Sequence, residues 1–415
     1  AMTRAVREAV NGLIGKVCEE GNANRDDILD CVFVANPIMH HLFLGIDPTE
    51  LGQAPFALAV SSALQYWAHD IDIEVNRGAR LYTLPCIAGH VGADAAGATL
   101  SEGPYRQDKM MLLVDVGTNA EIVLGNRNRV VAASSPTGPA FEGAEISSGQ
   151  RAAPGAIERV RIDPETLEPR FRVIGVDKWS DEDGFEEAAG AIGVTGICGS
   201  AIIEVVAEMY LSGIISEDGV IDGALAARSP RIFQNGRTFS YLLRDGEPRI
   251  TVTQNDVRAI QLAKAALYAG VKLLMEKQGI DHVDLIRFAG AFGSFIDPKY
   301  AMVLGLIPDC DLAEVKAVGN ASGTGAMMAL LNRDHRREIE DEVHRIEKIE
   351  TALEPHFQQI FIDAMALPNK VDPFPNLAAV VKLPPRKMAS EDAGQQESTP
   401  RRRSREERAA RRERG

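Results

Sequence analysis

The first hundred residues alternate between two apolar patterns. In residues 3–20 the apolar positions recur at helical spacing, at Val6, Ala9, Val10, Leu13, Ile14 and Val17. The apolar run 31–35 that follows has the length of a buried strand, and Asn36-Pro37 is typical of a helix start. Within 58–105 we expect a further helix, ahead of the Gly- and Ala-rich stretch PCIAGHVGADAAGATL.

Short apolar runs separated by Gly, Asn and Pro dominate the middle of the chain. They predict strands at 111–115, 121–124, 129–133, 158–163 and 170–174, and a hairpin within 229–253. A helix is expected to begin after Gly199. A long helix should then run from about 255 to 277, with Thr253 as its N-cap and Asp256 at the capping-box position. The strand 285–289 leads into a glycine turn.

The chain contains an internal repeat. When the sequence is shifted by 254 positions, identical residues align: Leu13 with Leu267, Val17 with Val271, Asp27 with Asp281, Asp30 with Asp284, and Ala35 with Ala289. Both copies have the same order of helix, acidic loop, strand, turn and helix. Only the second copy is preceded by a hairpin, within 111–133. We therefore expect the first half to be incomplete, with its hairpin upstream in a longer protein.

Composition and charge narrow the function classes. The 415 residues suggest two or three domains, and 45 basic against 59 acidic residues give a net charge of −14. Eight Arg lie within 401–415, so the rest of the chain is more acidic still, which argues against a nucleic-acid partner. The longest apolar runs are too short to span a membrane. Five isolated cysteines predict neither a zinc or iron–sulfur motif nor a disulfide framework, and we expect a cytoplasmic protein.

The turn after the strand 111–115 has the residues of a phosphate site. Gly117 allows backbone amides to approach a ligand closely, and Thr118 and Asn119 offer further donors. Asp115, at the strand end, suits a magnesium ion held through water. The alternative is a tight hairpin in which these residues have ordinary turn roles.

Two further segments are candidates for nucleotide contact. In Gly290-Ala291-Phe292-Gly293-Ser294, glycine at a strand end leaves room for a flat ligand, unless the turn is simply a tightly packed crossover. The segment from Gly196 through Gly199 and Ser200 opens a helix and also suits an anion.

Cys198, the stretch 319–326 and two glutamates could each have either a structural role or a chemical one. Cys198 is better explained as a packing residue than as a nucleophile. The small-residue stretch 319–326 suits close helix packing or a nucleotide pocket, and Glu142 and Glu145 are either solvated carboxylates or a candidate base. The catalytic residues are not identified by the sequence.

Longer strings resemble a known family. PCIAGHVGADA, LLVDVGTNAEIVLG, SPTGPAFEGAEISSGQRAAPGAIE, TGICGSAIIEVVAEM and FAGAFGSFIDPKYAMVLGLIPD, in this order within 3–332, are similar to the reductive activators of corrinoid proteins. The resemblance implies an α/β, duplicated ribonuclease-H-like, actin-like ATPase fold with mixed sheets flanked by helices. By position, Asp115, Gly117, Thr118 and Asn119 match the family's second phosphate loop, and Gly290, Gly293 and Ser294 its adenosine-side turn.

The resemblance also implies a function. Members couple ATP hydrolysis, with magnesium, to reduction of cobalt(II) corrinoid to cobalt(I) in corrinoid-dependent methyltransferase systems. The expected partner is a corrinoid protein, and a homodimer is possible. The two-iron ferredoxin cluster of the family would belong only to a preceding region. The alternatives are a small-molecule kinase of the same fold and a non-catalytic binding or dimerisation module.

These inferences divide the chain into four parts. We expect a partial first half of the ATPase-like domain at 1–106 and a second half with the nucleotide loops at 107–332. A helical extension, with one charged helix over 333–360, should occupy 333–384, and 385–415 should be a disordered Arg-rich tail. We expect the parent protein to be an ATP-hydrolysing reductive activator, of which this chain alone is an incomplete part.

Overall fold

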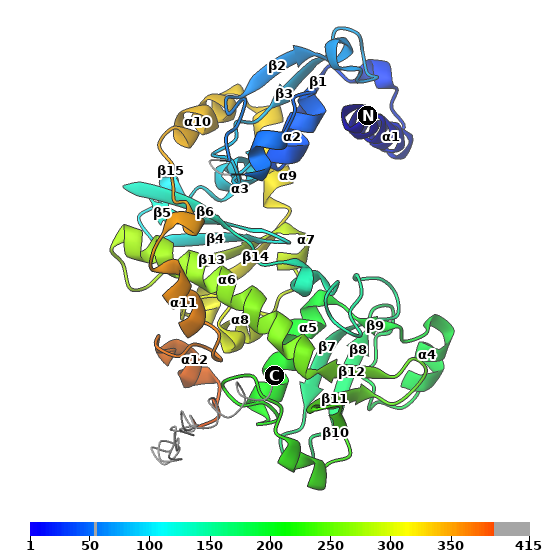
Figure 1. Cartoon of the computed structure of the whole chain (residues 1–415). Coiled ribbons are helices and arrows are strands. Elements are labelled where there is room, and N and C mark those ends of the chain that lie inside the picture. The colour runs from blue at the N-terminus through cyan, green and yellow to red at the C-terminus, as the bar shows by residue number, and fades with distance from the viewer. Residues whose placement is uncertain (54–55, 386–415) are drawn as a thin grey trace, which may run out of the picture. The chain divides into compact units, whose positions relative to one another are not determined.

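A six-stranded sheet forms the centre of the computed structural model, which describes residues 1–53 and 56–385 (Figure 1). Its strand order is β14-β13-β4-β5-β6-β15. The strands β4 (Met111–Val116), β5 (Ala120–Asn126) and β6 (Arg129–Ser135) are antiparallel, whereas β13 (Leu285–Ala289) and β14 (Val315–Gly319) run parallel to β4. The predicted hairpin is therefore confirmed, and the ends of β4 and β13 meet at one edge.

The long helix α6 (Gln254–Gln278) packs against β5 and β6. Its start has the predicted capping box, because the Asp256 amide donates to Thr253 Oγ1 and the Thr253 amide donates to Asp256 Oδ2. Such a cap contributes about 1 kcal/mol. Gly270 permits the close approach to the sheet, since a Cβ there would lie 2.7 Å from Ile122 Cδ1.

Two smaller sheets extend from the second half. One contains β7 (Ala156–Ile162), β8 (Pro169–Val173) and β9 (Gly196–Ile197), and the other is a meander of β10 (Ile232–Asn235), β11 (Thr238–Arg244) and β12 (Ile250–Thr253). The associated helices are α4 (Phe185–Ile192), α5 (Gly199–Leu211), α7 (Gly290–Gly293) and α8 (Pro298–Leu304). The helix α5 packs on β7 and α8.

The N-terminal region has its own three-stranded sheet, in the order β1-β3-β2. Its strands are β1 (Asp30–Phe33), β2 (Leu64–Trp67) and β3 (Arg80–Thr83), and its helices are α1 (Met2–Gly21) and α2 (Pro37–Leu44). The prediction of a helix ahead of the Gly- and Ala-rich stretch is wrong. Strands β2 and β3 occupy that segment, and the helix, α3 (Ala93–Glu102), lies inside the stretch itself.

The predicted repeat is matched in element order. The series α1-β1-α2 corresponds to α6-β13-α7, and β1 and β13 each have a parallel neighbour, β3 and β14. A helix follows each neighbour: α3 after β3, and α9 (Ala321–Leu331) after β14. In the described part of the chain β1 lies at a sheet edge, whereas β13 is flanked on both sides. An upstream hairpin beside β1 stays a prediction.

The C-terminal segment is not the single helix expected over 333–360. The helix α10 (Arg333–Val343) ends early, β15 (Glu347–Lys348) joins the central sheet beside β6, and α11 (Phe357–Asp363) and α12 (Pro375–Val380) follow. The short β15 forms because the buried Ile346 and Ile349 flank it and lie against the sheet. Apart from residue 385, the predicted disordered tail lies outside the described residues.

None of the helices in the described ranges is both long enough and apolar enough to cross a membrane. All five cysteines are free thiols, and four of them are buried.

Candidate nucleotide site

The turn between β4 and β5 has a backbone fixed by hydrogen bonds from Thr137, and its tip is exposed to solvent. Thr137 Oγ1 donates to the carbonyl oxygens of Gly117 and Thr118 at 2.7 and 3.1 Å, so these carbonyls point inward. Thr118 and Asn119 are exposed, and Thr118 Oγ1 donates to Glu142 Oε1 at 2.7 Å. The predicted phosphate turn therefore presents its polar groups on the surface.

Three carboxyl groups lie beside this turn. Asp115 and Glu121 stand directly opposite each other in the β4–β5 register, and Asp94 comes from the first turn of α3. Burial, together with the charge of Asp94, raises the pKa of Asp115 to about 6. Burial and the charges of Asp94 and Asp115 raise the pKa of Glu121 to about 9. A cation at this position would relieve the repulsion that these shifts record.

The glycine turn after β13 reaches the same place. Ala289 is the register partner of Asp115, and Gly290 follows with a φ of +84°. A Cβ at Gly290 would lie 2.3 Å from Asp115 Oδ1, so only glycine fits here. Ser294 Oγ donates to the Gly290 carbonyl and closes α7, while Gly293 packs against Phe288. Gly290 therefore lies against Asp115 beside the β4–β5 turn, and Gly293 and Ser294 shape the backbone that follows it.

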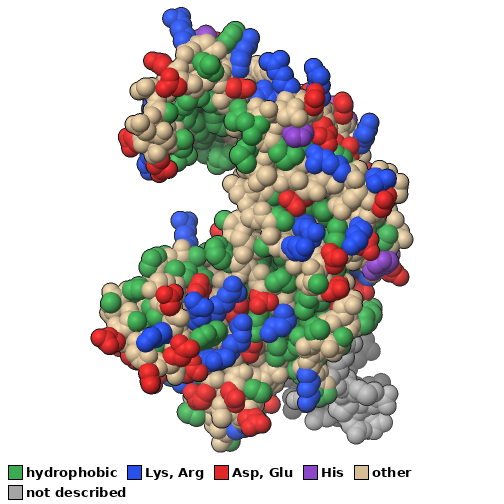
Figure 2. All heavy atoms as spheres, turned by 180° about the vertical axis from the view of Figure 1, so that it is seen from behind, with side chains coloured by type: hydrophobic (Ala, Val, Ile, Leu, Met, Phe, Trp, Pro, Cys, Tyr) green, Lys and Arg blue, Asp and Glu red, His purple; other side chains and the backbone are tan. Residues whose placement is uncertain are grey.

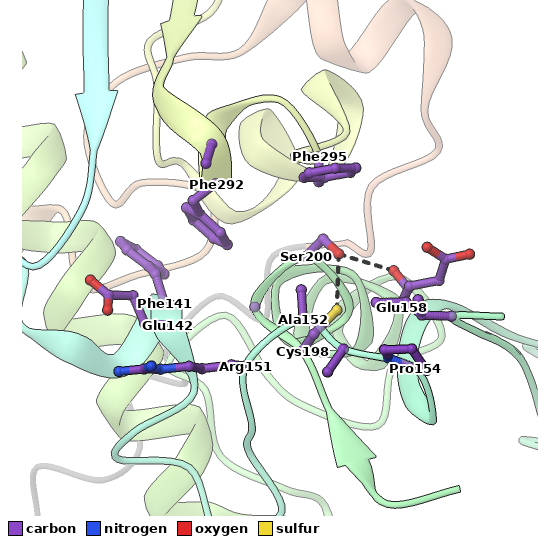
Figure 3. Close-up of a pocket in the computed structure, with 14 residues that line it drawn as sticks. Phe141, Glu142, Arg151, Ala152, Pro154, Glu158, Cys198, Ser200, Phe292 and Phe295 are labelled. Carbon is purple, nitrogen blue, oxygen red and sulfur yellow. Dashed lines mark hydrogen bonds between the residues drawn. The ribbon is translucent and has the colours of Figure 1, made fainter. Parts of the chain in front are cut away.

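A cavity of about 600 Å³ lies next to this junction (Figure 3). Three segments enclose it: the loop before β7, the start of α5 and the α7 turn. Its lining residues are Phe141, Glu142, Arg151, Ala152, Ala153, Pro154, Glu158, Ile174, Cys198, Gly199, Ser200, Ala291, Phe292 and Phe295. Figure 3 shows Phe292 and Phe295 on one side of the space and Pro154 and Cys198 on the other. The size and the mainly apolar walls suit a flat heterocycle.

The start of α5 is fitted closely to the cavity wall. A Cβ at Gly199 would lie 2.1 Å from the Phe141 carbonyl oxygen and 2.4 Å from Phe292 Cε2. The Phe141 and Phe292 rings stack at 6.2 Å. Ser200 Oγ donates to the Glu158 carbonyl at 3.2 Å, and buried Cys198 contacts Ser200. Cys198 therefore has the surroundings of a packing residue.

The structure brings most of the sequence candidates together. Asp115 and its turn meet Gly290, while Gly199 and Ser200 line the adjoining cavity. Gly196 is the exception: it lies in β9, where a Cβ would meet Gln150 and Ser148, and it does not line the cavity. The stretch 319–326 serves helix packing, because Gly325 contacts Gly97 of α3.

Sequence reasoning missed Asp94 and Glu121, and it included Phe292 in a candidate segment without giving that side chain a role. The sequence could have indicated Glu121, because in a hairpin with its turn centred on residue 118 Glu121 pairs with Asp115. Asp94 had no such signal, because its position depends on tertiary packing. Within the described ranges no group of three or more His, Cys, Asp or Glu side chains has the arrangement of a metal centre.

Comparisons with known proteins cover most of the chain. A family model described as the C-terminal domain of RACo, the ASKHA domain, matches residues 109–378, and a model of the RACo middle region matches residues 1–107. A solved structure described as a reductive activator for corrinoid, iron–sulfur protein superimposes with a TM-score of 0.75 at 32% identity, covering 88% of this chain and 57% of that one.

Two curated proteins are similar in sequence. The corrinoid activation enzyme RamQ of Eubacterium limosum is 34% identical over 371 residues, which cover 86% of this chain and 59% of RamQ. A Methanosarcina barkeri protein described as a reductase of the Co(II) methylated amine-specific corrinoid protein is 30% identical over 243 residues, or 54% of this chain and 39% of that protein. This chain thus spans well under two thirds of either relative.

The family matches cover nearly all of 1–378, and they confirm the actin-like ATPase fold predicted from the sequence. The chain belongs to the RACo family, with that family's middle region followed by its C-terminal ASKHA domain.

Proposed function

We propose that this chain binds ATP with magnesium at the junction of the phosphate turn and the cavity. The observation that carries the proposal is the contact of Gly290 with Asp115, which joins the turn 117–119 to the cavity inside the family's ASKHA domain. Exposed amides and hydroxyls of the turn would hold phosphate oxygens. The adenine ring of ATP would enter the cavity between Phe292 and Pro154.

The carboxyl groups fit a magnesium ion held mainly through water. Asp115 is the direct candidate, with Asp94 and Glu121 placed to accept hydrogen bonds from bound water once ionised. The ion would neutralise phosphate charge next to the turn. In this arrangement the protein supplies position and charge, and no residue is assigned as the catalytic base.

We further propose that the longer protein uses ATP to activate a corrinoid protein by reduction of cobalt(II). Support comes from the names of the relatives, a corrinoid activation enzyme and a corrinoid protein reductase. ATP would change how the corrinoid partner is held, which requires contacts made in only one of two states. A preceding two-iron ferredoxin region, a cytoplasmic location and a homodimer complete the proposal.

The first test is isothermal titration of the chain with a non-hydrolysable ATP analogue and magnesium. We expect micromolar binding by the wild type and at least a tenfold loss in Asp115→Asn, because the main ligand to the ion is removed. Asp108→Asn is the matched control, since that carboxylate is exposed and pairs with Arg127 away from the turn. Equal binding by all three proteins would exclude Asp115 from the site.

A second measurement is needed if the wild type gives no binding signal with the ATP analogue. If the wild type does not bind, a version extended upstream is titrated in the same way. Binding restored by the extension would mean that the site needs both halves of the fold. Failure of the extended version as well would contradict the ATP proposal itself.

A further inference from the structure

Four arginines occupy one face of the β7–β8 hairpin. Arg159 is the register partner of Arg172, and Arg161 is the register partner of Arg170. Directly opposed residues of an antiparallel pair share a face, so all four side chains lie on the same side of the sheet. Figure 2 shows Lys and Arg side chains gathered over this part of the molecule, with acidic side chains around them. We call these four residues the arginine ladder.

Neighbouring side chains extend the ladder. The backbones of Trp179 and Arg172 form a β-bridge, and the guanidinium groups of Arg170 and Arg161 lie 4.8 and 5.7 Å from the Trp179 ring. Arg161 also lies 4.8 Å from the ring of Tyr300, and Lys299 Nζ lies 4.0 Å from the same ring. The face thus combines cations with the partly exposed Trp179 ring, while the buried Tyr300 ring packs against Arg161 from within.

The carboxylates nearby do not balance these charges. Buried Glu204 accepts from both Arg159 and Arg161, at 2.7 and 2.6 Å. Arg170 has only a 3.8 Å pair with Asp181. For Arg172 the described residues provide no ion pair, and its Nε is buried without a hydrogen-bond partner.

Like charges placed directly opposite each other destabilise a sheet. Two such pairs stand on one hairpin, and the described carboxylates pair with three of the four arginines and leave Arg172 without an ion pair, so part of the repulsion on this face remains uncompensated. We propose that the arginine ladder is a docking surface for a carboxylate-rich surface of a partner protein. Under the proposed function, on which this identification of the partner rests, that partner is the corrinoid protein.

The local chemistry favours carboxylates over nucleic acid. Glu204 already shows how one carboxylate joins two neighbouring arginines of the ladder. Arginine forks match carboxylate geometry in two parallel hydrogen bonds. The acidic body around the face would repel the continuous charge of a nucleic acid, whereas a compact protein surface needs only a local match.

The ladder adjoins the nucleotide cavity along one strand. Glu158 lines the cavity, and Arg159 is the next residue of β7. Ser200, at the start of α5, bonds to the Glu158 carbonyl, and Glu204 of the same helix holds the ladder. A partner on this face would therefore be in contact with the strand and the helix that border the cavity.

The test measures binding of a fluorescein-labelled deca-glutamate peptide by anisotropy at low salt, with the full chain. The variant Arg170→Glu/Arg172→Glu should weaken binding at least tenfold and reduce its salt dependence. The matched control is Arg4→Glu/Arg337→Glu, which changes the net charge equally at exposed sites on α1 and α10. A single-stranded decanucleotide serves as the competing probe. Arg159 and Arg161 are not substituted, because their loss would leave the buried carboxylate of Glu204 without an ion-pair partner.

Each outcome decides the proposal. The proposal is supported if only the ladder variant loses peptide binding and if the wild type binds the decanucleotide more weakly than the peptide. Equal losses in both charge variants would indicate a net-charge effect, and tighter binding of the decanucleotide would indicate a phosphate-bearing partner; either result overturns it. Peptide binding needs neither nucleotide nor corrinoid, so this result is independent of the titration with ATP analogue.

A fold control separates docking from structure. Arg170→Gln/Arg172→Gln should weaken peptide binding and leave the Tm unchanged or higher, because repulsion across the strands is relieved. A clear fall in Tm would show that the arginines hold the hairpin together, and the docking role would then be rejected.

Discussion

Glu121 carries a carboxyl group in surroundings that favour its protonated form. It faces Asp115 across the hairpin, and the charges of Asp115 and Asp94 add to the effect of burial on its pKa. In the absence of a cation the site therefore holds a proton at neutral pH. Binding of a cation would favour the ionised form and release that proton, so occupancy and protonation are linked at this residue.

This linkage predicts how stability depends on pH. The pKa of Glu121 rises from its ordinary value of 4.5 to about 9 on folding. Between these values the folded state binds more protons than the unfolded chain, so stability falls as the pH rises, by at most about 1.4 kcal/mol per unit from this group. In urea unfolding from pH 5 to 9 without magnesium, Glu121→Gln should flatten the decline.

The control for this series is Glu145→Gln, at an exposed position in the loop after the phosphate turn. It should follow the wild-type curve. If Glu121→Gln also follows that curve, the carboxyl group is not held in its protonated form by the fold.

At the scale of elements, the crossing of α3 and α9 joins the two segments whose elements follow the same order. Gly97 and Gly325 occupy the fifth position of their helices and lie against each other. Ser322 Oγ of α9 also donates to the Asp94 carbonyl in α3. Because Asp94 belongs to the first turn of α3, this crossing sets the position of one carboxyl group of the candidate site.

The crossing predicts an unusual response to alanine. In an open helix, glycine to alanine stabilises by roughly 0.5–1 kcal/mol. A Cβ at Gly325 would lie 2.0 Å from the Gly97 carbonyl oxygen, so Gly325→Ala should instead destabilise by about 1–3 kcal/mol through overpacking. Gly12→Ala in α1, where no atom lies within 4 Å, should be stabilising. Urea unfolding of both variants checks the sign, and two stabilised proteins would mean that the helices move apart freely.

At the scale of the whole described chain, the C-terminal segment returns to the long helix α6. Lys264 is fully buried and donates from Nζ to the carbonyls of Ala366 and Pro368, at 2.5 and 2.8 Å. One and two turns further along, Tyr268 and Lys272 both bind Asp372. Burial lowers the pKa of Lys264 well below its ordinary range. A single helix face thus holds a segment about a hundred residues away in sequence.

Removal of this anchor should loosen the segment. Lys264→Met keeps most of the side-chain volume but leaves two buried carbonyls without a donor, at a cost of about 1–3 kcal/mol for each unsatisfied group. We expect lower stability in urea and faster hydrogen exchange over 365–372. Lys316→Met, on the exposed side of β14, is the control and should leave both unchanged. Unaltered exchange in Lys264→Met would show that other contacts hold the segment.

Local patterns determined much of this architecture. The strands of the hairpin, the helix over 254–278 and its capping box follow from short-range rules, because periodicity, turn residues and caps act within a few positions. The same locality made Asp115, Gly117, Thr118 and Asn119 stand out as candidates for a phosphate turn, a role that stays a prediction. It failed at 58–105 and 333–360, where packing partners far away in sequence decide between strand and helix.

Only the tertiary structure decided how these pieces meet. The contact between Gly290 and Asp115 depends on β13 pairing with β4, which joins residues about 170 positions apart. The position of Asp94 beside them depends on α3 packing against α9, and the arginine ladder depends on the register of β7 with β8. Such contacts are invisible to local patterns because their energy comes from surfaces that only the folded chain brings together.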